Sequence, residues 1–227
     1  AAIHADRRGM LTVSFLNAGK SAVVFIDAPS GRKVLVDGGS DASVLRALSK
    51  VMPWYDRWID VVIAAHPDAA HATGLIDVLQ RYNVARAFTS SAQGSGPVMQ
   101  TFERSLADAK GQGTNVSTLR RGQGIDLGKG AYIEILFPDR DLSGAPASAG
   151  CIEMRLVYGV TSFMLSCGNT AIEDYLVRLD GNALHSDVLS VNDGASATSS
   201  ALFAGFVGTQ TIAHSGMTLV SDGKIVH

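Results

Sequence analysis

The chain has 227 residues, 46% of them hydrophobic, and it carries 19 Lys and Arg against 21 Asp and Glu, a formal net charge of −2. This length and apolar content are sufficient to bury a large core. The balanced charge excludes the broad basic surface that tight, salt-sensitive binding to a phosphate backbone requires, so any contact with nucleic acid must be local. No apolar run approaches the roughly 20 residues that span a bilayer, and we expect a soluble chain.

The N-terminal half reads as a run of strands followed by alternating helices and strands. Residues 1–9 are polar and predict a linker or tail, and residues 10–227 predict a single domain. Short apolar or alternating runs predict strands at 11–15, 22–26, 33–36, 61–65, 85–89 and 116–120. Apolar residues at helical spacing predict helices at 44–51, 74–82 and 97–110.

The C-terminal half repeats this pattern after a turn-rich segment at residues 121–130. Strands are predicted at 131–137, 152–158, 161–166, 188–191, 211–213 and 218–226, and helices at 171–179 and 199–206. Two successive sets of strands, each followed by helices, favour two mixed sheets packed face to face with helices outside. The predicted fold is therefore an α/β (α+β) protein with a four-layer αββα architecture.

The stretch from Ile59 to Leu75 carries the strongest chemical signal. An apolar run ends abruptly on His66-Pro67-Asp68, and His71 follows three residues later. Two imidazoles and one carboxylate on a loop after a strand are a typical metal-binding set. An equally good interpretation is that Asp68 caps the following helix and that the histidines pack locally.

Two cysteines, Cys151 and Cys167, exclude a disulfide framework and a cysteine-only zinc site. They flank a hairpin that turns at residues 158–161, which places them almost opposite each other. This placement therefore permits a single disulfide between the two cysteines. We favour two buried, unpaired cysteines.

Several motifs together resemble the metallo-β-lactamase superfamily, and within it the C-terminal domain of competence DNA-uptake channel proteins of the ComEC type. The likeness covers most of the chain. The segments that carry it are Leu11-Thr-Val-Ser-Phe-Leu-Asn-Ala-Gly19, Val34-Leu-Val-Asp-Gly-Gly39, His66-Pro-Asp-Ala-Ala-His71, Arg121-Gly-Gln-Gly-Ile-Asp-Leu-Gly128 and Ser186-Asp-Val-Leu-Ser-Val191. The resemblance implies a metallo-β-lactamase-like sandwich.

The departures from the family pattern fall on the metal ligands. Ala70 stands where the family has the Asp of its H-x-x-x-D-H run, and Asn169 stands where it has a bridging Asp. Asp193 and Gly194 replace a pair of histidines. A two-metal hydrolytic site needs anionic ligands to hold two neighbouring cations, so the resemblance implies a dismantled site.

The expected residual cleft consists of Asp37, His66, Asp68, His71, Asn169 and Asp193. For Asp37, hydrogen bonding to the backbone of the Gly38–Gly39 turn is at least as good an interpretation as a role in the cleft. Any remaining metal site would use His66, Asp68, His71 and Asp193. We expect no metal at full occupancy and at most one weakly bound zinc or manganese ion.

The resemblance implies that relatives with an intact metal site cleave phosphodiester bonds in incoming DNA on the outer side of the cytoplasmic membrane. For this chain we expect a non-catalytic role, structural or DNA-guiding, with weak binding to single-stranded DNA and attachment to the membrane channel of a larger protein. One alternative is an active metal-dependent nuclease with a rebuilt one-metal site. Another is an interaction domain without DNA contact.

Overall fold

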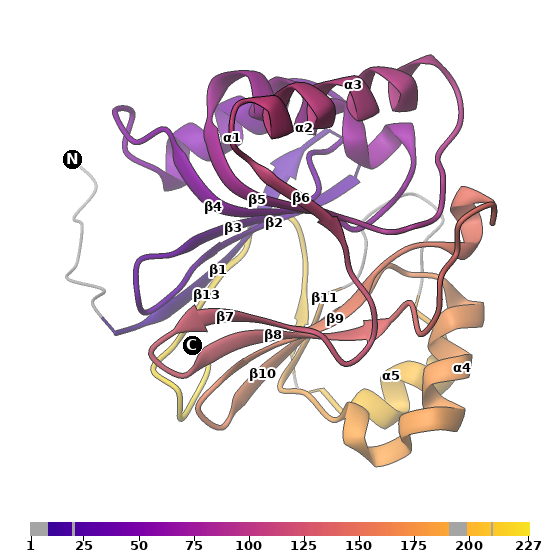
Figure 1. Ribbon diagram of the computed structural model, residues 1–227. Coiled ribbons are helices and arrows are strands. Elements are labelled where there is room, and N and C mark those ends of the chain that lie inside the picture. The colour runs from indigo at the N-terminus through magenta and orange to yellow at the C-terminus, as the bar shows by residue number, and fades with distance from the viewer. Residues whose placement is uncertain (1–8, 20, 191–198, 210) are drawn as a thin grey trace.

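The structure is a computed structural model that describes residues 9–19, 21–190, 199–209 and 211–227 (Figure 1). Seven strands form the first sheet in the order β13-β1-β2-β3-β4-β5-β6. Their bounds are β1 Leu11–Ala18, β2 Ser21–Asp27, β3 Lys33–Val36, β4 Trp58–Ala64, β5 Asn83–Thr89, β6 Asn115–Thr118 and β13 Thr218–Ser221.

Six strands form the second sheet in the order β12-β11-β10-β9-β8-β7. Their bounds are β7 Gly124–Gly128, β8 Ala131–Phe137, β9 Glu153–Tyr158, β10 Thr161–Leu165, β11 Val188–Ser190 and β12 Thr211–Ala213. The segment predicted as a turn-rich connection contains β7, whose buried side chains, Ile125 and Leu127, alternate with exposed ones. Its glycines and charged residues obscured that alternation.

Helices cover the outer face of each sheet (Figure 1). The helices α1, α2 and α3 lie on the first sheet, and α4 and α5 lie on the second. Their bounds are α1 Ser43–Val51, α2 Ala69–Arg81, α3 Pro97–Gly111, α4 Thr170–Asp180 and α5 Ala201–Val207, with short 3-10 helices η1 Ala147–Ala149 and η2 Gly181–Leu184. The predicted αββα arrangement is confirmed. Among the described helices, none is both long and apolar enough to cross a membrane.

Both faces of the central strands are buried because each sheet is covered on both sides. Successive residues of a strand point to opposite faces. In β3, Val34 and Val36 pack in the core between the sheets, whereas Leu35 packs under the helices. Phe163 and Leu165 of β10 face the same inter-sheet core. Continuous apolar runs are the sequence signature of this arrangement.

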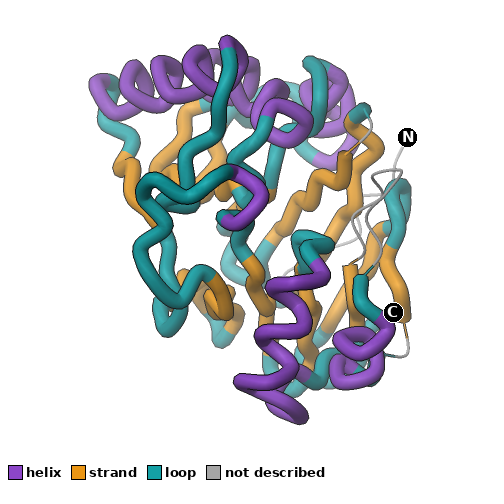
Figure 2. Tube along the Cα trace, turned by 90° about the vertical axis from the view of Figure 1, so that its right-hand side faces the viewer, coloured by secondary structure: helices purple, strands orange, loops and turns teal. Residues whose placement is uncertain are grey.

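Strand direction places the candidate site at one edge of the sandwich. Strands β3 to β6 are parallel, as are β10 to β12. Parallel strands carry their carboxyl ends to the same edge of a sheet, where ligands of open α/β sheets bind. Figure 2 looks onto an edge of the sandwich and shows loops and a short helix between the two outer layers.

Candidate functional site

A cleft of about 610 Å³ lies where strands from both sheets end. His66 follows β4 of the first sheet, and Cys167 and Asn169 follow β10 of the second. The lining includes His66, Asp68, Ser148, Cys151, Cys167 and Asn169. The structure therefore brings three of the predicted site residues, His66, Asp68 and Asn169, to one cleft.

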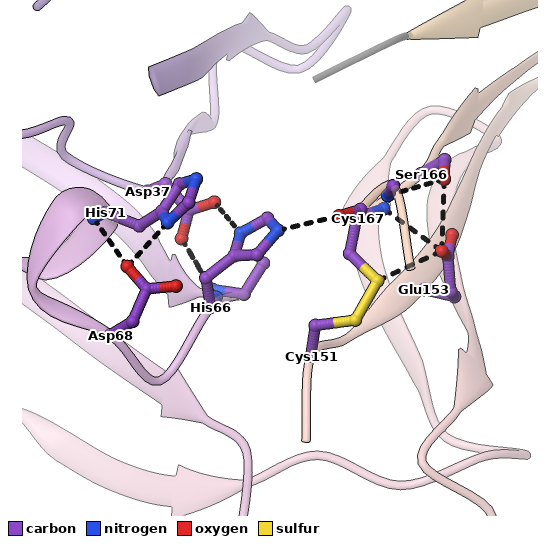
Figure 3. Close-up of polar contacts among 10 residues, drawn as sticks. Asp37, His66, Asp68, His71, Cys151, Glu153, Ser166 and Cys167 are labelled. Atoms are coloured by element: carbon purple, nitrogen blue, oxygen red, sulfur yellow. Dashed lines mark hydrogen bonds and ion pairs between the residues drawn. A yellow bond between two sulfur atoms is a disulfide. The ribbon is translucent and has the colours of Figure 1, made fainter. Parts of the chain in front are cut away.

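Asp37 holds His66 in place through both carboxylate oxygens (Figure 3). Oδ2 lies 2.7 Å from Nδ1 of His66, and Oδ1 accepts hydrogen bonds from the backbone N–H groups of Ala65 at 2.8 Å and of His66 at 3.2 Å. Asp37 itself is buried and has a φ of 58°, a conformation that Asp tolerates better than most residues. The carboxylate of Asp37 therefore positions His66, and its role is not to stabilise the Gly38–Gly39 turn.

The other ring nitrogen of His66 reaches across to the second sheet. Nε2 lies 3.1 Å from the carbonyl oxygen of Cys167. Burial alone would lower the pKa of His66, but the charge and hydrogen bond of Asp37, together with the Cys167 carbonyl, outweigh burial and raise the pKa to about 9. His66 is therefore an imidazolium at neutral pH. Both of its ring N–H groups donate to protein acceptors and join the two sheets.

Asp68 caps helix α2, and His71 lies on that helix. The carboxylate of Asp68 accepts from the backbone N–H of His71 at 3.2 Å and lies 2.8 Å from its Nδ1. This cap starts α2 at Ala69, five residues before the predicted helix, so the prediction that His71 lies on a loop is wrong. Burial alone would raise the pKa of Asp68, but its contacts with His71 and the charge of His66 lower it.

The rings of His66 and His71 are stacked with centroids 3.9 Å apart and an interplanar angle of 17°. Close packing of α2 against the end of β3 brings them together. The N–H of Gly38 donates to the carbonyl of His71 at 2.8 Å, and a Cβ on Gly74 would lie 2.0 Å from the carbonyl oxygen of Gly38. Glycine at these positions allows the helix to approach the strand.

Asn169 has a structural role in the second sheet's helical layer. Its side-chain oxygen accepts from the backbone N–H groups of Ala171 at 3.1 Å and Ile172 at 3.3 Å, which caps α4. Its amide nitrogen donates to the carbonyl of Ser148 at 2.7 Å. Asn169 occupies the position where the resemblance implies a bridging Asp. Both the oxygen and the nitrogen of its side-chain amide are thus bonded to backbone groups.

The described residues do not fit the two-metal centre that the fold family implies. Both ring nitrogens of His66 have protein partners, Nδ1 of His71 lies on Asp68, and the Asn169 amide caps a helix. Asp193 lies outside the described residues, so a metal site formed by His66, Asp68, His71 and Asp193 stays a prediction. In the described part of the chain, potential ligands gather in one place, at Cys151, Glu153 and Cys167.

Cys151 and Cys167 form a disulfide in the wall of the cleft. They lie just outside the antiparallel pair β9 and β10, whose last paired residues are Met154 and Leu165. The prediction of unpaired cysteines is therefore wrong, although both side chains are buried as expected. The hairpin register was the signal that favoured the bridge.

Glu153 and Glu173 were not predicted as site residues, and both are fully buried. Glu153 Oε1 accepts from the hydroxyl of Ser166 at 3.1 Å and from the backbone N–H of Cys167 at 3.0 Å. Burial and the nearby charge of Glu173 raise the pKa of Glu153 to about 8, so this carboxyl group is largely neutral at pH 7. No local sequence signal distinguishes Glu153, because Arg155 on the same strand is charged as well.

No protein-family model and no curated protein matches this sequence. Solved structures do match its fold. A metallo-β-lactamase fold protein, YhfI from Bacillus subtilis, superposes with a TM-score of 0.59 at 15% identity, covering 92% of this chain and 98% of that one. A diphosphatase from the PhnP family gives a TM-score of 0.51 at 15% identity, with 93% and 97% covered.

A metallo-β-lactamase from Cronobacter sakazakii gives a TM-score of 0.51 at 15% identity, with 78% of this chain and 76% of that chain covered. At 15% sequence identity, the similarity to these three structures shows a shared fold alone. The first two proteins are covered over almost their full length, and the third over about three quarters. The chain therefore has the metallo-β-lactamase fold.

Proposed function

We propose that this chain is a metallo-β-lactamase-fold domain of the ComEC type in which an internal hydrogen-bond network has replaced the hydrolytic metal centre. Its role is then structural or DNA-guiding rather than catalytic. The observation that carries this proposal is the engagement of both His66 ring nitrogens, by Asp37 on one side and by the Cys167 carbonyl on the other.

Metal coordination requires a lone pair on an imidazole nitrogen, so a histidine ligand is neutral. The raised pKa of His66, about 9 without a bound cation, means that a metal ion must displace the ring proton at pH 7. Binding a cation there would require loss of that proton and of the contact between Nε2 and Cys167. The negative charge of Asp37 is instead compensated by His66 itself.

The cleft keeps the features of a site for weak, local contact with single-stranded DNA. Its lining includes the polar residues Ser148 and Asn169 and the first residue of α4, Thr170, and the positive end of a helix dipole favours anions. The formal net charge of −2 limits the phosphate contacts to a few. A structural neighbour with this fold is described as a diphosphatase, which supports contact with phosphate groups in this fold.

The disulfide supports placement on the extracytoplasmic face of the membrane, as part of a larger channel protein. Disulfides form and persist in oxidising compartments and are rare in reducing ones. Together with the ComEC-like segments around residues 11–19 and 34–39, it favours a domain that meets DNA before the strand crosses the membrane.

The test is metal analysis of oxidised protein purified without chelator, followed by a manganese-dependent nuclease assay on a single-stranded oligonucleotide. We expect well under one equivalent of zinc or manganese and no cleavage. Binding to the oligonucleotide, measured by fluorescence anisotropy, should be weak and should fall as salt is raised.

One tightly held equivalent of metal, with turnover that His66→Ala abolishes, would establish instead an active nuclease with a rebuilt one-metal site. Absence of any salt-dependent binding to the oligonucleotide would favour an interaction domain without DNA contact. Glu134→Gln, which removes a carboxylate on β8 outside the cleft, is the control for nonspecific effects of charge.

A further inference from the structure

Three potential metal ligands are packed together in the wall of the cleft, at positions where the resemblance places no metal ligand. The Sγ atoms of Cys151 and Cys167 and a carboxylate oxygen of Glu153 all lie within 4.8 Å of one another, and all three residues are buried. Figure 3 shows Glu153 pointing toward the sulfur of Cys167, and Oε1 lies 3.1 Å from that sulfur.

The carboxyl group of Glu153 is incompletely satisfied. Oε1 accepts from Ser166 and Cys167, but buried Oε2 has no hydrogen-bond partner among the described residues. A buried polar atom without a partner costs free energy, of the order of 1–3 kcal/mol. The Glu153 carboxyl group, with Oε1 beside the Cys167 sulfur, therefore has one oxygen without a hydrogen-bond partner that is available to a ligand.

We propose that the dithiol form of this chain binds one thiophilic divalent cation, of which Zn²⁺ is the best fit, between the thiolates of Cys151 and Cys167 and the carboxylate of Glu153. The disulfide is the oxidised, metal-free state of this site. The proposal does not rest on the proposed function, because none of the three ligands is at a position where the family resemblance places one.

The geometry suits zinc. Bonds of about 2.3 Å to sulfur and about 2.0–2.2 Å to carboxylate oxygen in a tetrahedron hold ligand atoms roughly 3.3–3.8 Å apart. The present spread of at most 4.8 Å needs little rearrangement once the S–S bond is broken. Cys151 and Cys167 are among the residues that line the cleft, from which a water molecule can supply the fourth ligand.

The redox step is a two-electron reduction. An external dithiol transfers two electrons and two protons to the S–S bond, leaves two thiols on the protein and becomes a disulfide itself. In vitro a phosphine does the same and becomes its oxide, with water supplying the oxygen atom and the two protons. Binding of one divalent cation then releases both thiol protons to solvent, together with the carboxyl proton of Glu153 where that group is protonated.

The test is a Co²⁺ titration of protein reduced with phosphine and desalted without oxygen. We expect one equivalent to bind, with a thiolate-to-cobalt charge-transfer band in the near ultraviolet that Zn²⁺ displaces. Oxidised protein should show no such band. Cys167→Ser should abolish it, and Glu153→Gln should weaken Co²⁺ binding at least about tenfold, as loss of an anionic ligand does.

Asp68→Asn is the matched control, because it alters a residue at a family ligand position and keeps a side chain that can cap α2. Its titration should match that of the unsubstituted protein. Circular dichroism of each reduced variant checks folding. If Cys167→Ser fails to fold, the Co²⁺ affinity of Glu153→Gln still tests the proposal, because that variant retains both cysteines.

A folded, reduced protein that shows no thiolate-to-cobalt band would overturn the proposal. So would a band that Glu153→Gln leaves at full affinity, or one that Asp68→Asn removes. Metal binding to the oxidised protein that depends on His66 would contradict the proposed function alone. The two proposals can therefore fail independently of each other.

Discussion

Glu153 of β9 and Glu173 of α4 share the hydroxyl group of Ser166. Its Oγ lies 3.1 Å from Oε1 of Glu153 and 2.7 Å from Oε1 of Glu173. The other oxygen of Glu173 accepts from the backbone N–H of Ser200 at 2.6 Å, at the start of α5. These two buried carboxyl groups therefore join the second sheet to both helices that cover it.

The raised pKa of Glu153 makes stability depend on pH. Between about 4.5, its ordinary pKa, and about 8, the folded protein binds a proton that the unfolded chain has lost. The contribution is fully present below pH 4.5 and is lost as pH rises through 8, at about 1.4 kcal/mol per pH unit within that window. Urea unfolding between pH 5 and pH 9 measures it.

Glu153→Gln should remove this dependence and make the oxidised protein relatively more stable at pH 9. The raised pKa of His66 also lowers stability as pH rises from 6.5 to about 9, so the difference between variant and unsubstituted protein is the quantity to compare. Glu134→Gln, a substitution of a half-exposed carboxylate, serves as control. Parallel pH profiles for Glu153→Gln and the unsubstituted protein would contradict the assignment.

His66→Ala should be strongly destabilising because it leaves the buried carboxylate of Asp37 without its charged partner. Removing one member of a buried ion pair costs about 3–5 kcal/mol. The double variant with Asp37→Asn should lose less than the sum of the two single variants, with a coupling of about 0.5–3 kcal/mol. Chemical denaturation at pH 6 measures all three, and additive losses would show that the pair does not act as a unit.

Reduction of the Cys151–Cys167 disulfide should lower the free energy of unfolding by about 3 kcal/mol, the chain-entropy value for a loop of this size. Urea unfolding with and without phosphine measures the change. A double substitution of both cysteines by serine should be insensitive to reductant. An unchanged unfolding midpoint in the unsubstituted protein would mean that the bridge does not constrain the unfolded chain.

Asp68→Ala should cost about 1 kcal/mol by removing the cap of α2, whereas Asp68→Asn should cost much less because an amide oxygen also accepts from a backbone N–H. The loss should appear as faster amide exchange in the first turn of α2, around His71. Equal stability of the alanine and asparagine variants would show that the cap contributes little.

Local sequence patterns predicted several parts of the candidate site. The apolar run before His66 predicts a strand with chemistry at its end, and the Asp68 spacing permits a helix cap. The interpretation of that stretch as a helix cap with locally packed histidines is confirmed, since Asp68 caps α2 and the histidines pack on each other, whereas metal binding there stays a prediction. The start of α2 was misplaced because the cap, rather than the apolar periodicity, sets it.

The sequence by itself determined the helices, their layering and the strands other than β7, because alternation and helical spacing are local properties that record which faces are buried. Only the tertiary structure decided which side chains meet. The contact between His66 and Cys167 joins residues 101 apart, and the disulfide depends on the register of a hairpin. Such contacts depend on how two sheets pack, and no short stretch of sequence encodes the position of the other sheet.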